Sequence, residues 1–320
     1  MDNNIIIIGA GLCGLTLSSQ LMKTGLSSCI LEKSKSVGGR LATRRDGENC
    51  FDHGAQFYKH SLEKPFLWHD QLSDLGLSKL WFSQDQVLHY HVAGGMTKLA
   101  KIINSEFEAA QNIIFNEKII SLKDKDHLIE VTCESGQIYS TKKIIFTSPL
   151  PQSIEILRSS EIIYPAALEN IKYAKSLVGL VTFNNEMSDV LSQINFLRFN
   201  ENLFSISNNK SKQISLNHTL TIVMSPDWSE KNYEKAESDV LKLILDHLFQ
   251  IFPKLDLNMV IQQQLKKWKY SHPFVKFDSD FLSLDKPNQK TKIILAGDAF
   301  GGASLHGAVQ SAVAVAQFMK

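Results

Sequence analysis

Three glycines near the N-terminus have the spacing of a phosphate-binding turn. The run Gly9-Ala10-Gly11-Leu12-Cys13-Gly14 follows the apolar segment Ile5–Ile8 and opens a segment with helical periodicity. In such a turn the first glycine permits a tight bend, the second lets backbone approach a pyrophosphate, and the third lets helix and strand pack closely. The unpaired N–H groups at the start of the helix add positive potential. The pattern therefore predicts a dinucleotide site.

A carboxylate follows at the expected distance. Glu32 ends the next predicted strand, which begins at Cys29, near the spacing of about 20 residues at which an acid accepts hydrogen bonds from a ribose diol. A phosphorylated ribose would be repelled there. Beyond it, Gly38–Arg45 places a flexible turn and then several cations where the phosphates and sugar of a bound dinucleotide would lie. The turn and Glu32 alone suit NAD and FAD equally.

Together with a late Gly297-Asp298, these motifs resemble the FAD-binding domain of the amine oxidase superfamily. Within it, Gly38–Arg45 and Phe51–Phe57 are similar to the renalase family, particularly to its bacterial branch. His89–Met96 resembles the segment before that family's Gly-Met helix, although Gly94 replaces a proline often seen there.

Two more segments carry the resemblance with departures. Trp268-Lys269-Tyr270 resembles a Trp-Arg-Tyr element, with lysine in place of arginine. Gly301–Ala308 resembles the closing flavin-contact segment, with His306 at a position that is often glutamate. Residues 151–265 carry no matching motif.

The resemblance implies a non-covalent FAD. The residues expected to contact it are Gly9, Gly11, Leu12, Cys13, Gly14, Glu32, Lys33, Gly39, Arg40, Leu41, His53, Gly54, Ala55, Gln56, Ile119, Gly297, Asp298, Leu305, Gly307 and Ala308. The expected substrate pocket consists of Gln56, Trp268, Tyr270 and His272. We expect the three aromatic rings to hold a flat substrate, with packing between domains as the alternative.

Two parts of this site have a chemical rationale of their own. Gly54 and Ala55 are small enough for a flat ring to rest on their backbone, and His53 either relays a proton or is a hydrogen-bonded structural residue. Asp298 would accept a ribityl hydroxyl or lie beside the pyrophosphate. The helix from about Gly307 would direct N–H groups at the flavin's pyrimidine edge, or merely follow a glycine-rich turn.

The activity implied by the resemblance is that of a renalase-like oxidase. Such an enzyme oxidises 2- and 6-dihydro isomers of NAD(P)H to NAD(P)+ and passes the electrons to oxygen, giving hydrogen peroxide. An amine oxidase or a desaturase on the same fold is one alternative, because fold and FAD site do not fix the substrate. A flavin-bound scaffold or sensor without turnover is another.

The predicted fold is α/β. Strand Ile5–Ile8, a helix from Leu12 to Thr24 and the strand ending on Glu32 form a βαβ unit, and Ile113–Phe146 alternates like an antiparallel meander. A final buried strand in 292–296 and a helix in 307–319 resemble the strand and helix of this first βαβ unit. We therefore expect a discontinuous Rossmann-like FAD-binding domain and a second α+β substrate domain built on an antiparallel sheet. The predicted ranges are 1–60, 92–150 and 288–320 for the first domain, and 61–91 and 151–287 for the second.

Composition narrows the possible partners. The chain has 320 residues, with 34 basic and 33 acidic side chains, so it creates no field that gathers nucleic acid or an anionic membrane. A small molecule is the expected partner. The four cysteines lack zinc spacing and are expected to be reduced thiols, and no metal is predicted, since His89 and His91 have no third ligand at a companion spacing. Without a secretion signal or an apolar run of about 18 to 20 residues, the predicted location is the cytoplasm.

Overall fold

The chain forms two compact units, which we describe separately. The computed structural model describes residues 2–105, 113–125, 127–184, 188–199, 201–284 and 291–320. The first unit consists of Met1–Arg40, Leu99–Tyr173 and His272–Lys320, and the second of Leu41–Lys98 and Ala174–Ser271. These boundaries differ from the predicted ranges: residues 41–60 and 92–98 group with the second unit, and residues 151–173 and 272–287 with the first.

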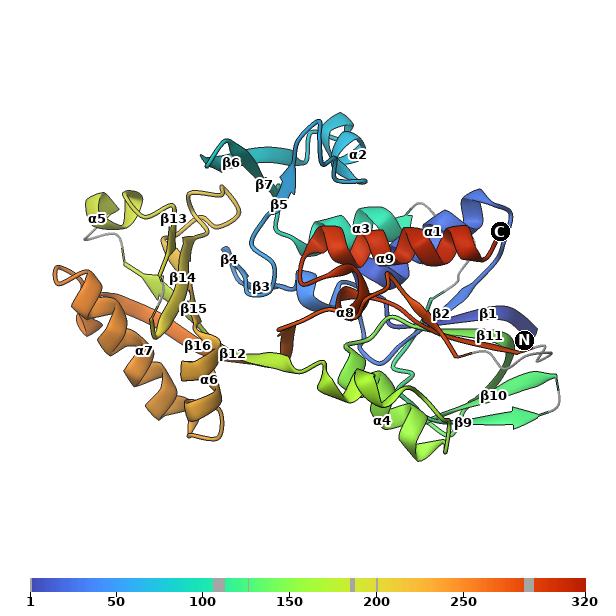
Figure 1. Ribbon diagram of the computed structural model, residues 1–320. Coiled ribbons are helices and arrows are strands. Elements are labelled where there is room, and N and C mark those ends of the chain that lie inside the picture. The colour runs from blue at the N-terminus through green and yellow to red at the C-terminus, as the bar shows by residue number, and fades with distance from the viewer. Residues whose placement is uncertain (1, 106–112, 126, 185–187, 200, 285–290) are drawn as a thin grey trace. The chain divides into compact units, whose positions relative to one another are not determined.

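A mainly parallel sheet forms the centre of the first unit (Figure 1). Its central strand β1 (Asp2–Ile8) pairs in parallel with β2 (Cys29–Glu32) on one side and β11 (Ile138–Phe146) on the other. The sheet continues to β8 (Ile113–Phe115) beyond β2, and to β18 (Lys292–Leu295) beyond β11. Ile5, Ile6 and Ile7 are buried, as expected of a strand covered on both faces. The predicted Rossmann-like fold is confirmed.

The strand order determines where a ligand binds. The chain fills the sheet outward from β1 in both directions, and open α/β sheets bind ligands at the carboxyl ends of the strands where the order reverses. β1 leads into Gly9 there, β2 ends on Glu32, β11 leads into Thr147, and β18 leads into Gly297 through Ala296. Segments distant in the sequence therefore meet at this edge.

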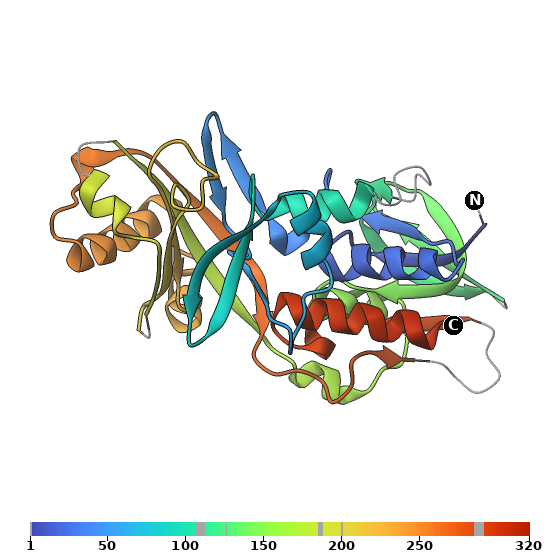
Figure 2. The ribbon, with the colours of Figure 1, turned by 90° about the horizontal axis from the view of Figure 1, so that it is seen from above.

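Helices cover both faces of this sheet. α1 (Leu12–Lys23) and α9 (Leu305–Phe318) lie side by side on one face, while α4 (Leu150–Ser159) lies on the other (Figures 1 and 2). In the sequence, Thr147–Pro151 is typical of a stop after the strand that ends at Phe146, so no helix is expected at α4. Proline is also favoured in the first turn of a helix, and α4 carries Pro151 there.

The predicted meander is correct only in part. Strands β9 (Ile119–Lys125), β10 (Leu128–Cys133) and β11 are antiparallel neighbours, as expected. However, β8 pairs in parallel with β2, and β11 is itself a parallel member of the central sheet. The strands of the meander are thus part of the same sheet as β1 and β2. The short strand β17 (Leu282–Ser283) also joins this sheet, by antiparallel pairing with β18.

The second unit contains a five-stranded sheet. Its strands, in order across the sheet, are β13 (Phe196–Arg198), β14 (Leu203–Asn208), β15 (Thr219–Met224), β12 (Tyr173–Phe183) and β16 (Val260–Pro273). The pairs β13–β14, β14–β15 and β15–β12 are antiparallel. Helices α6 (Pro226–Asn232) and α7 (Glu237–Ile251) cover one face, and Val240, Ile244 and Leu248 of α7 are buried in the core (Figure 1). The second sheet that the sequence predicts is therefore present.

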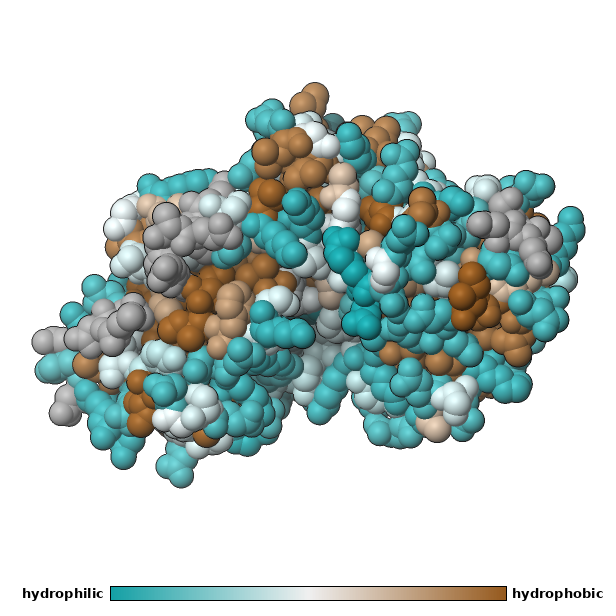
Figure 3. Space-filling view, turned by 180° about the vertical axis from the view of Figure 1, so that it is seen from behind, coloured by the Kyte–Doolittle hydropathy of each residue, from teal (hydrophilic) through white to brown (hydrophobic). Residues whose placement is uncertain are grey.

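Smaller elements complete the structure: η1 (Gly39–Leu41), β3 (Thr43–Asp46), β4 (Asn49–Asp52), β5 (Tyr58–His60), α2 (His69–Asp74), β6 (Ser78–Gln84), β7 (Val87–Val92), α3 (Thr97–Ser105), η3 (Ala166–Asn170), α5 (Ser188–Ser192), η4 (Leu257–Met259) and α8 (Asp298–Gly301). Apolar side chains reach the surface around α2 and β6, including Leu67, Leu75 and Leu80 (Figure 3). Among the described helices, none combines the length and apolarity that a membrane span requires.

Candidate functional site

The glycine turn has the geometry that the motif predicts. Gly9 adopts a left-handed conformation with φ of +101°, which favours glycine. A Cβ atom on Gly14 would lie 2.0 Å from the carbonyl oxygen of Gly9, so only glycine lets α1 start this close to β1. A Cβ on Gly11 would meet nothing within 4 Å, and no described side chain caps the helix there. The turn thus leaves space beside the helix N-terminus, as a pyrophosphate requires.

Thr147 closes the turn from β11, a contact that the sequence analysis missed. Its hydroxyl donates to the carbonyl oxygens of Ile8, at 2.8 Å, and Gly9, at 3.2 Å. Its backbone N–H also donates to Ile8, at 3.0 Å. A lone threonine after a strand gives no sequence signal for this role.

Glu32 accepts a hydrogen bond from the glycine turn itself. Its side chain is buried, and its Oε2 accepts from the N–H of Ala10 while Oε1 accepts from the N–H of Ser34, both at 2.7 Å. A carboxylate has about four lone-pair sites, so each oxygen keeps capacity for a ribose hydroxyl. Together with the open space at Gly11, this donor and acceptor set fits the adenosine and pyrophosphate part of FAD.

We expect Glu32→Gln to weaken FAD binding by about 2 kcal/mol, because a charged acceptor is lost and the new NH₂ group faces a backbone N–H. Titration of apoprotein with FAD should show a dissociation constant raised about thirtyfold. Glu117→Gln is a matched control, because Glu117 is also buried in the first unit but accepts from Ser135 away from the turn. Equal affinities of wild type and Glu32→Gln would contradict the assignment.

A buried carboxylate lies at the second strand end, with partners that the sequence did not reveal. Asp298 Oδ2 accepts from Arg40 Nη1 at 2.5 Å, and its Oδ1 accepts from Arg40 Nη2 and the Tyr173 hydroxyl, both at 2.9 Å. Burial raises the pKa of Tyr173, and the negative charge of Asp298 adds to this effect. Asp298 was expected to accept a ribityl hydroxyl or to lie beside the pyrophosphate, and three of its roughly four lone-pair sites are taken by Arg40 and Tyr173. Its observed role is to fix η1 against β18.

The start of α9 also differs from the expectation. The helix begins at Leu305, and its N-terminal residue Ser304 accepts the Gly307 N–H at 3.0 Å through its side-chain oxygen. Gly307 therefore does not direct a free N–H group outward. Its role is steric, because a Cβ there would lie 2.1 Å from the carbonyl oxygen of Gly302. Ala308 is bound as well, since its N–H donates to the Ser304 carbonyl at 3.1 Å.

Several other residues that were predicted to contact FAD have side chains that are buried or hydrogen-bonded to other residues. The side chains of Leu12, Cys13, Leu41 and Ile119 are buried, so they do not reach an open surface. Lys33 Nζ donates to Gln152 at 3.2 Å. Gly39 and Gly297 have positive φ values of 51° and 119° and form the tight turns beside Arg40 and Asp298.

In the second unit, His53 packs on Trp268. The two rings are stacked with centroids 5.4 Å apart, and Trp268 Nε1 donates to the His53 carbonyl at 2.8 Å. Burial lowers the pKa of His53 to about 4, and the positive charges of Lys266 and Arg44 contribute in the same direction. His53 is therefore neutral at physiological pH. Within the described residues its Nδ1 has no hydrogen-bond partner, so it is available to accept or donate.

The residues of the predicted substrate pocket belong to different units of the structure. Trp268 and Tyr270 lie two residues apart on β16 in the second unit. Between them in sequence, Lys269 places its Nζ 5.4 Å from the Tyr270 ring centroid. His272 belongs to the first unit. Gln56 was expected in the pocket, but its buried side chain is held by Lys212 Nζ and by two carbonyl groups of its own loop. Its amide thus organises the loop from inside.

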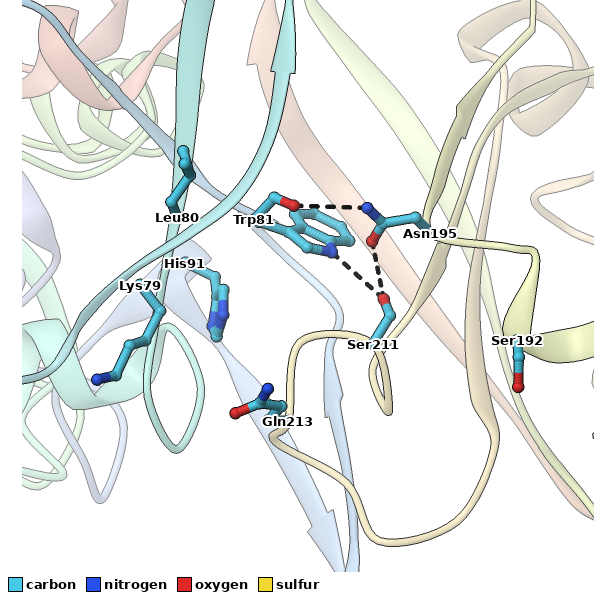
Figure 4. Close-up of a pocket in the computed structure, with 8 residues that line it drawn as sticks. All are labelled: Lys79, Leu80, Trp81, His91, Ser192, Asn195, Ser211 and Gln213. Atoms are coloured by element: carbon cyan, nitrogen blue, oxygen red, sulfur yellow. Dashed lines mark hydrogen bonds between the residues drawn. The ribbon is translucent and has the colours of Figure 1, made fainter.

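A cavity of about 390 Å³ opens in the second unit (Figure 4). Its lining consists of Lys79, Leu80, Trp81, His91, Ser192, Asn195, Ser211 and Gln213, none of which was predicted as a site residue. Trp81, Asn195 and Ser211 are linked by hydrogen bonds on one side, and His91 and Gln213 lie on the other (Figure 4).

The buried imidazole of this cavity makes stability depend on pH. Burial, aided by the charge of Lys212, lowers the pKa of His91 from 6.5 to about 4. Between these values the unfolded chain binds a proton that the folded chain excludes, so stability falls as the pH drops from 6.5 to 4. We expect a loss of about 3 kcal/mol from this residue, measured by denaturant unfolding across that range. His91→Phe should flatten the dependence, the exposed His127→Gln should not, and equal slopes for both variants would refute the prediction.

Comparison with known proteins gives two family matches. The profile "NAD(P)-binding Rossmann-like domain" matches residues 7–70, and "Flavin containing amine oxidoreductase" matches residues 62–319. A phytoene desaturase of Fusarium fujikuroi is 28% identical over 120 residues, covering 33% of this chain and 20% of the relative. An L-amino-acid oxidase of Siganus canaliculatus is 24% identical over 259 residues, covering 67% of this chain and 48% of the relative. The chain thus matches less than half the length of these relatives.

Solved structures share the fold across the whole chain. A protein of Exiguobacterium sp. 255-15, provisionally assigned as a protoporphyrinogen oxidase, has a TM-score of 0.77 at 12% identity, covering 98% of both chains. A putrescine oxidase bound to putrescine has a TM-score of 0.71 at 12% identity, covering 100% of this chain and 99% of that one. At this identity the likeness concerns the fold alone.

Proposed function

This chain belongs to the flavin-containing amine oxidoreductase family and its cofactor is FAD; from that premise we propose that it oxidises a dihydropyridine dinucleotide. The proposed substrates are the 2- and 6-dihydro isomers of NAD(P)H, the substrates implied by the resemblance of Gly38–Arg45 and Phe51–Phe57 to renalases. The ring loses a hydride, and oxygen takes up its two electrons and proton together with one further proton. The products are NAD(P)+ and hydrogen peroxide.

Each unit contains residues that this proposal assigns to FAD. Gly11 and the N-terminus of α1 hold the pyrophosphate, and Glu32 holds the adenosine ribose. The backbone of His53, Gly54 and Ala55 supports the flat ring. FAD supplies the electron acceptor, so the side chains need only bind, orient and exclude competing reactions. All four cysteines are free and buried, including Cys50 beside this segment, which supports a non-covalent cofactor that acid precipitation would release.

The observation that carries the choice of substrate is the positive electrostatic environment of His53. Burial is the main cause of its lowered pKa, and Lys266 and Arg44 lower it further. Asp52 opposes them, but Asp52 forms a buried ion pair with Lys212 at 3.3 Å. A protonated amine placed against His53 would be repelled. A neutral dihydropyridine that carries an anionic pyrophosphate would be attracted, and Trp268 offers a flat apolar wall.

An amine oxidase or desaturase on the same fold is the alternative. Its support is the family itself, since the relatives described above include an L-amino-acid oxidase and a phytoene desaturase. The charges around His53 favour the dinucleotide over the cationic amine, and they give no preference for an uncharged desaturase substrate that lacks phosphate.

Charge reversal at Lys266 tests this proposal. We expect Lys266→Glu to lower kcat/KM for the dihydronicotinamide isomers about tenfold, because one attractive charge becomes repulsive, and the loss should shrink at high salt. Lys267→Glu on the same strand is the matched control, since Lys267 Nζ instead donates to carbonyl groups of Tyr233 and Lys235. The assignment fails if Lys266→Glu leaves kcat/KM for the isomers unchanged.

A further inference from the structure

A fully buried lysine lies in the second unit, next to the segment proposed to support the flavin. Lys212 belongs to the loop between β14 and β15, and its side chain has 0% exposure. Its neighbours in sequence, Ser211 and Gln213, line the cavity described above (Figure 4). Nothing in the sequence around it suggested a site. A buried ammonium is costly unless each of its donors has a partner, so its contacts need an explanation.

Each N–H donor of Lys212 has an acceptor. Nζ lies 2.8 Å from Gln56 Oε1, 3.3 Å from Asp52 Oδ2, and 4.4 Å from the centroid of the Trp81 ring. An ammonium has three donors, and a carboxylate, an amide oxygen and an aromatic face together satisfy all three. Burial lowers the pKa of Lys212 while the charge of Asp52 opposes the change. The three acceptors are those that a protonated lysine requires.

Asp52 joins this lysine to the rest of the segment. It is wholly buried, and its Oδ1 accepts from the Thr43 hydroxyl at 2.6 Å and from the Met96 N–H at 2.8 Å. Its backbone N–H donates to Asn209 Oδ1 at 3.3 Å, and its carbonyl accepts from the Thr221 hydroxyl at 3.0 Å. Strands β3 and β4, the turn before α3 and the loop that carries Lys212 therefore converge on one carboxylate.

Gln56 transmits the constraint to the backbone. Its Nε2 donates to the carbonyl oxygens of Asp52, at 2.5 Å, and Gly54, at 3.2 Å. Because Lys212 only donates, it fixes the amide with Oε1 toward the lysine and the NH₂ toward these two carbonyls. A flipped amide would present donor to donor and release both carbonyls. The orientation of the Gln56 amide thus depends on the lysine.

We propose that Lys212 is a positioning residue that, through Asp52 and Gln56, fixes the backbone of His53, Gly54 and Ala55 for the flavin. This inference rests on the proposed function only in placing that backbone against the flavin ring. It does not depend on which substrate is oxidised. Lys212 itself would not touch the flavin, since its three donors are used.

Lys212→Met and Gln56→Met test the inference without substrate. Gln56→Met keeps the side-chain length, and Lys212→Met keeps most of the apolar stem while removing the charge. Gln56→Met leaves the ion pair intact, so it remains informative if Lys212→Met fails to fold. We expect each to change the visible circular dichroism of bound FAD and to raise its dissociation constant at least fivefold. Lys210→Met in the same loop is the control, expected to leave both unchanged. A wild-type spectrum and affinity in Gln56→Met would overturn the proposal.

A double variant separates positioning from stability. Asp52→Asn combined with Lys212→Met removes both buried charges, so thermal stability should recover toward wild type relative to either single variant. The altered flavin spectrum should persist, because the Gln56 amide is still unrestrained. Recovery of the spectrum together with stability would show a merely structural ion pair. Failure of the dihydronicotinamide assignment would leave these substrate-free readouts unchanged, so the two proposals fail separately.

Discussion

Gly14→Ala is expected to destabilise the first unit by about 3 kcal/mol, against the usual gain from replacing glycine in a helix. The added Cβ would lie 2.0 Å from the Gly9 carbonyl oxygen and 2.8 Å from Thr147 Oγ1. The first contact is with backbone, so relief requires moving α1 away from β1. Denaturant unfolding of the apoprotein measures the loss. Stability equal to that of wild type would contradict the close packing described here.

Gly11→Ala is the matched control, three residues earlier in the same motif. Gly11 has φ of −81° and ψ of −177°, which alanine adopts readily, and its Cβ would meet no atom within 4 Å. We expect unchanged stability of the apoprotein and FAD binding weakened at least tenfold, because the methyl group occupies space needed by the pyrophosphate. Wild-type affinity in this variant would exclude a phosphate beside Gly11.

Breaking the Arg40–Asp298 pair is expected to cost about 3 kcal/mol. Asp298 is nearly buried, with a side-chain exposure of 9%, and Arg40 binds it through two nitrogens. Arg40→Met leaves that carboxylate with the hydrogen bond from Tyr173, and removing one member of a buried pair leaves an uncompensated charge. Adding Asp298→Asn should recover part of the loss, so that the two substitutions are strongly non-additive in denaturant unfolding.

The Arg158–Glu169 pair provides the comparison within the same unit. Its side chains are 63% and 42% exposed, so water already screens both charges. Arg158→Met should therefore leave the stability close to that of wild type. A similar cost for the two arginine variants would mean that the Asp298 site is not the buried anchor described here.

The dinucleotide turn could be predicted from the sequence because its constraints are local. Gly9, Gly11 and Gly14 act through backbone geometry within a few residues, and the apolar run before them identifies the strand. The buried face of α7 could be predicted too, because the apolar residues of Glu234–Phe252 recur with helical spacing. The helix begins at Glu237, after Ala236, and so starts later than this pattern suggests. Its apolar face extends over several turns, whereas its start depends on one residue.

The missed features depend on contacts between distant segments. Arg40 and Asp298 are far apart in the sequence. Nothing in the sequence near either residue indicates that Arg40 and Tyr173 both donate to the Asp298 carboxylate. Lys212 has no recognisable signal in the sequence, and its contact with Gln56 exists only because the loop after β14 folds against the segment that follows β4. The α4 helix was missed for a different reason, since Pro149-Leu150-Pro151 was interpreted as a stop and not as a helix start.

Anaerobic mixing of the FAD-loaded protein with each possible donor tests the central claim most directly. We expect the 2- and 6-dihydro isomers to bleach the flavin absorbance at least a hundredfold faster than ordinary 4-dihydro NADH, because hydride transfer needs the donating carbon within about 3.5 Å of its acceptor and each isomer presents a different carbon. Putrescine and L-amino acids should reduce it no faster than 4-dihydro NADH. Equal rates with all dihydro isomers, or fast reduction by an amine, would contradict the proposed activity.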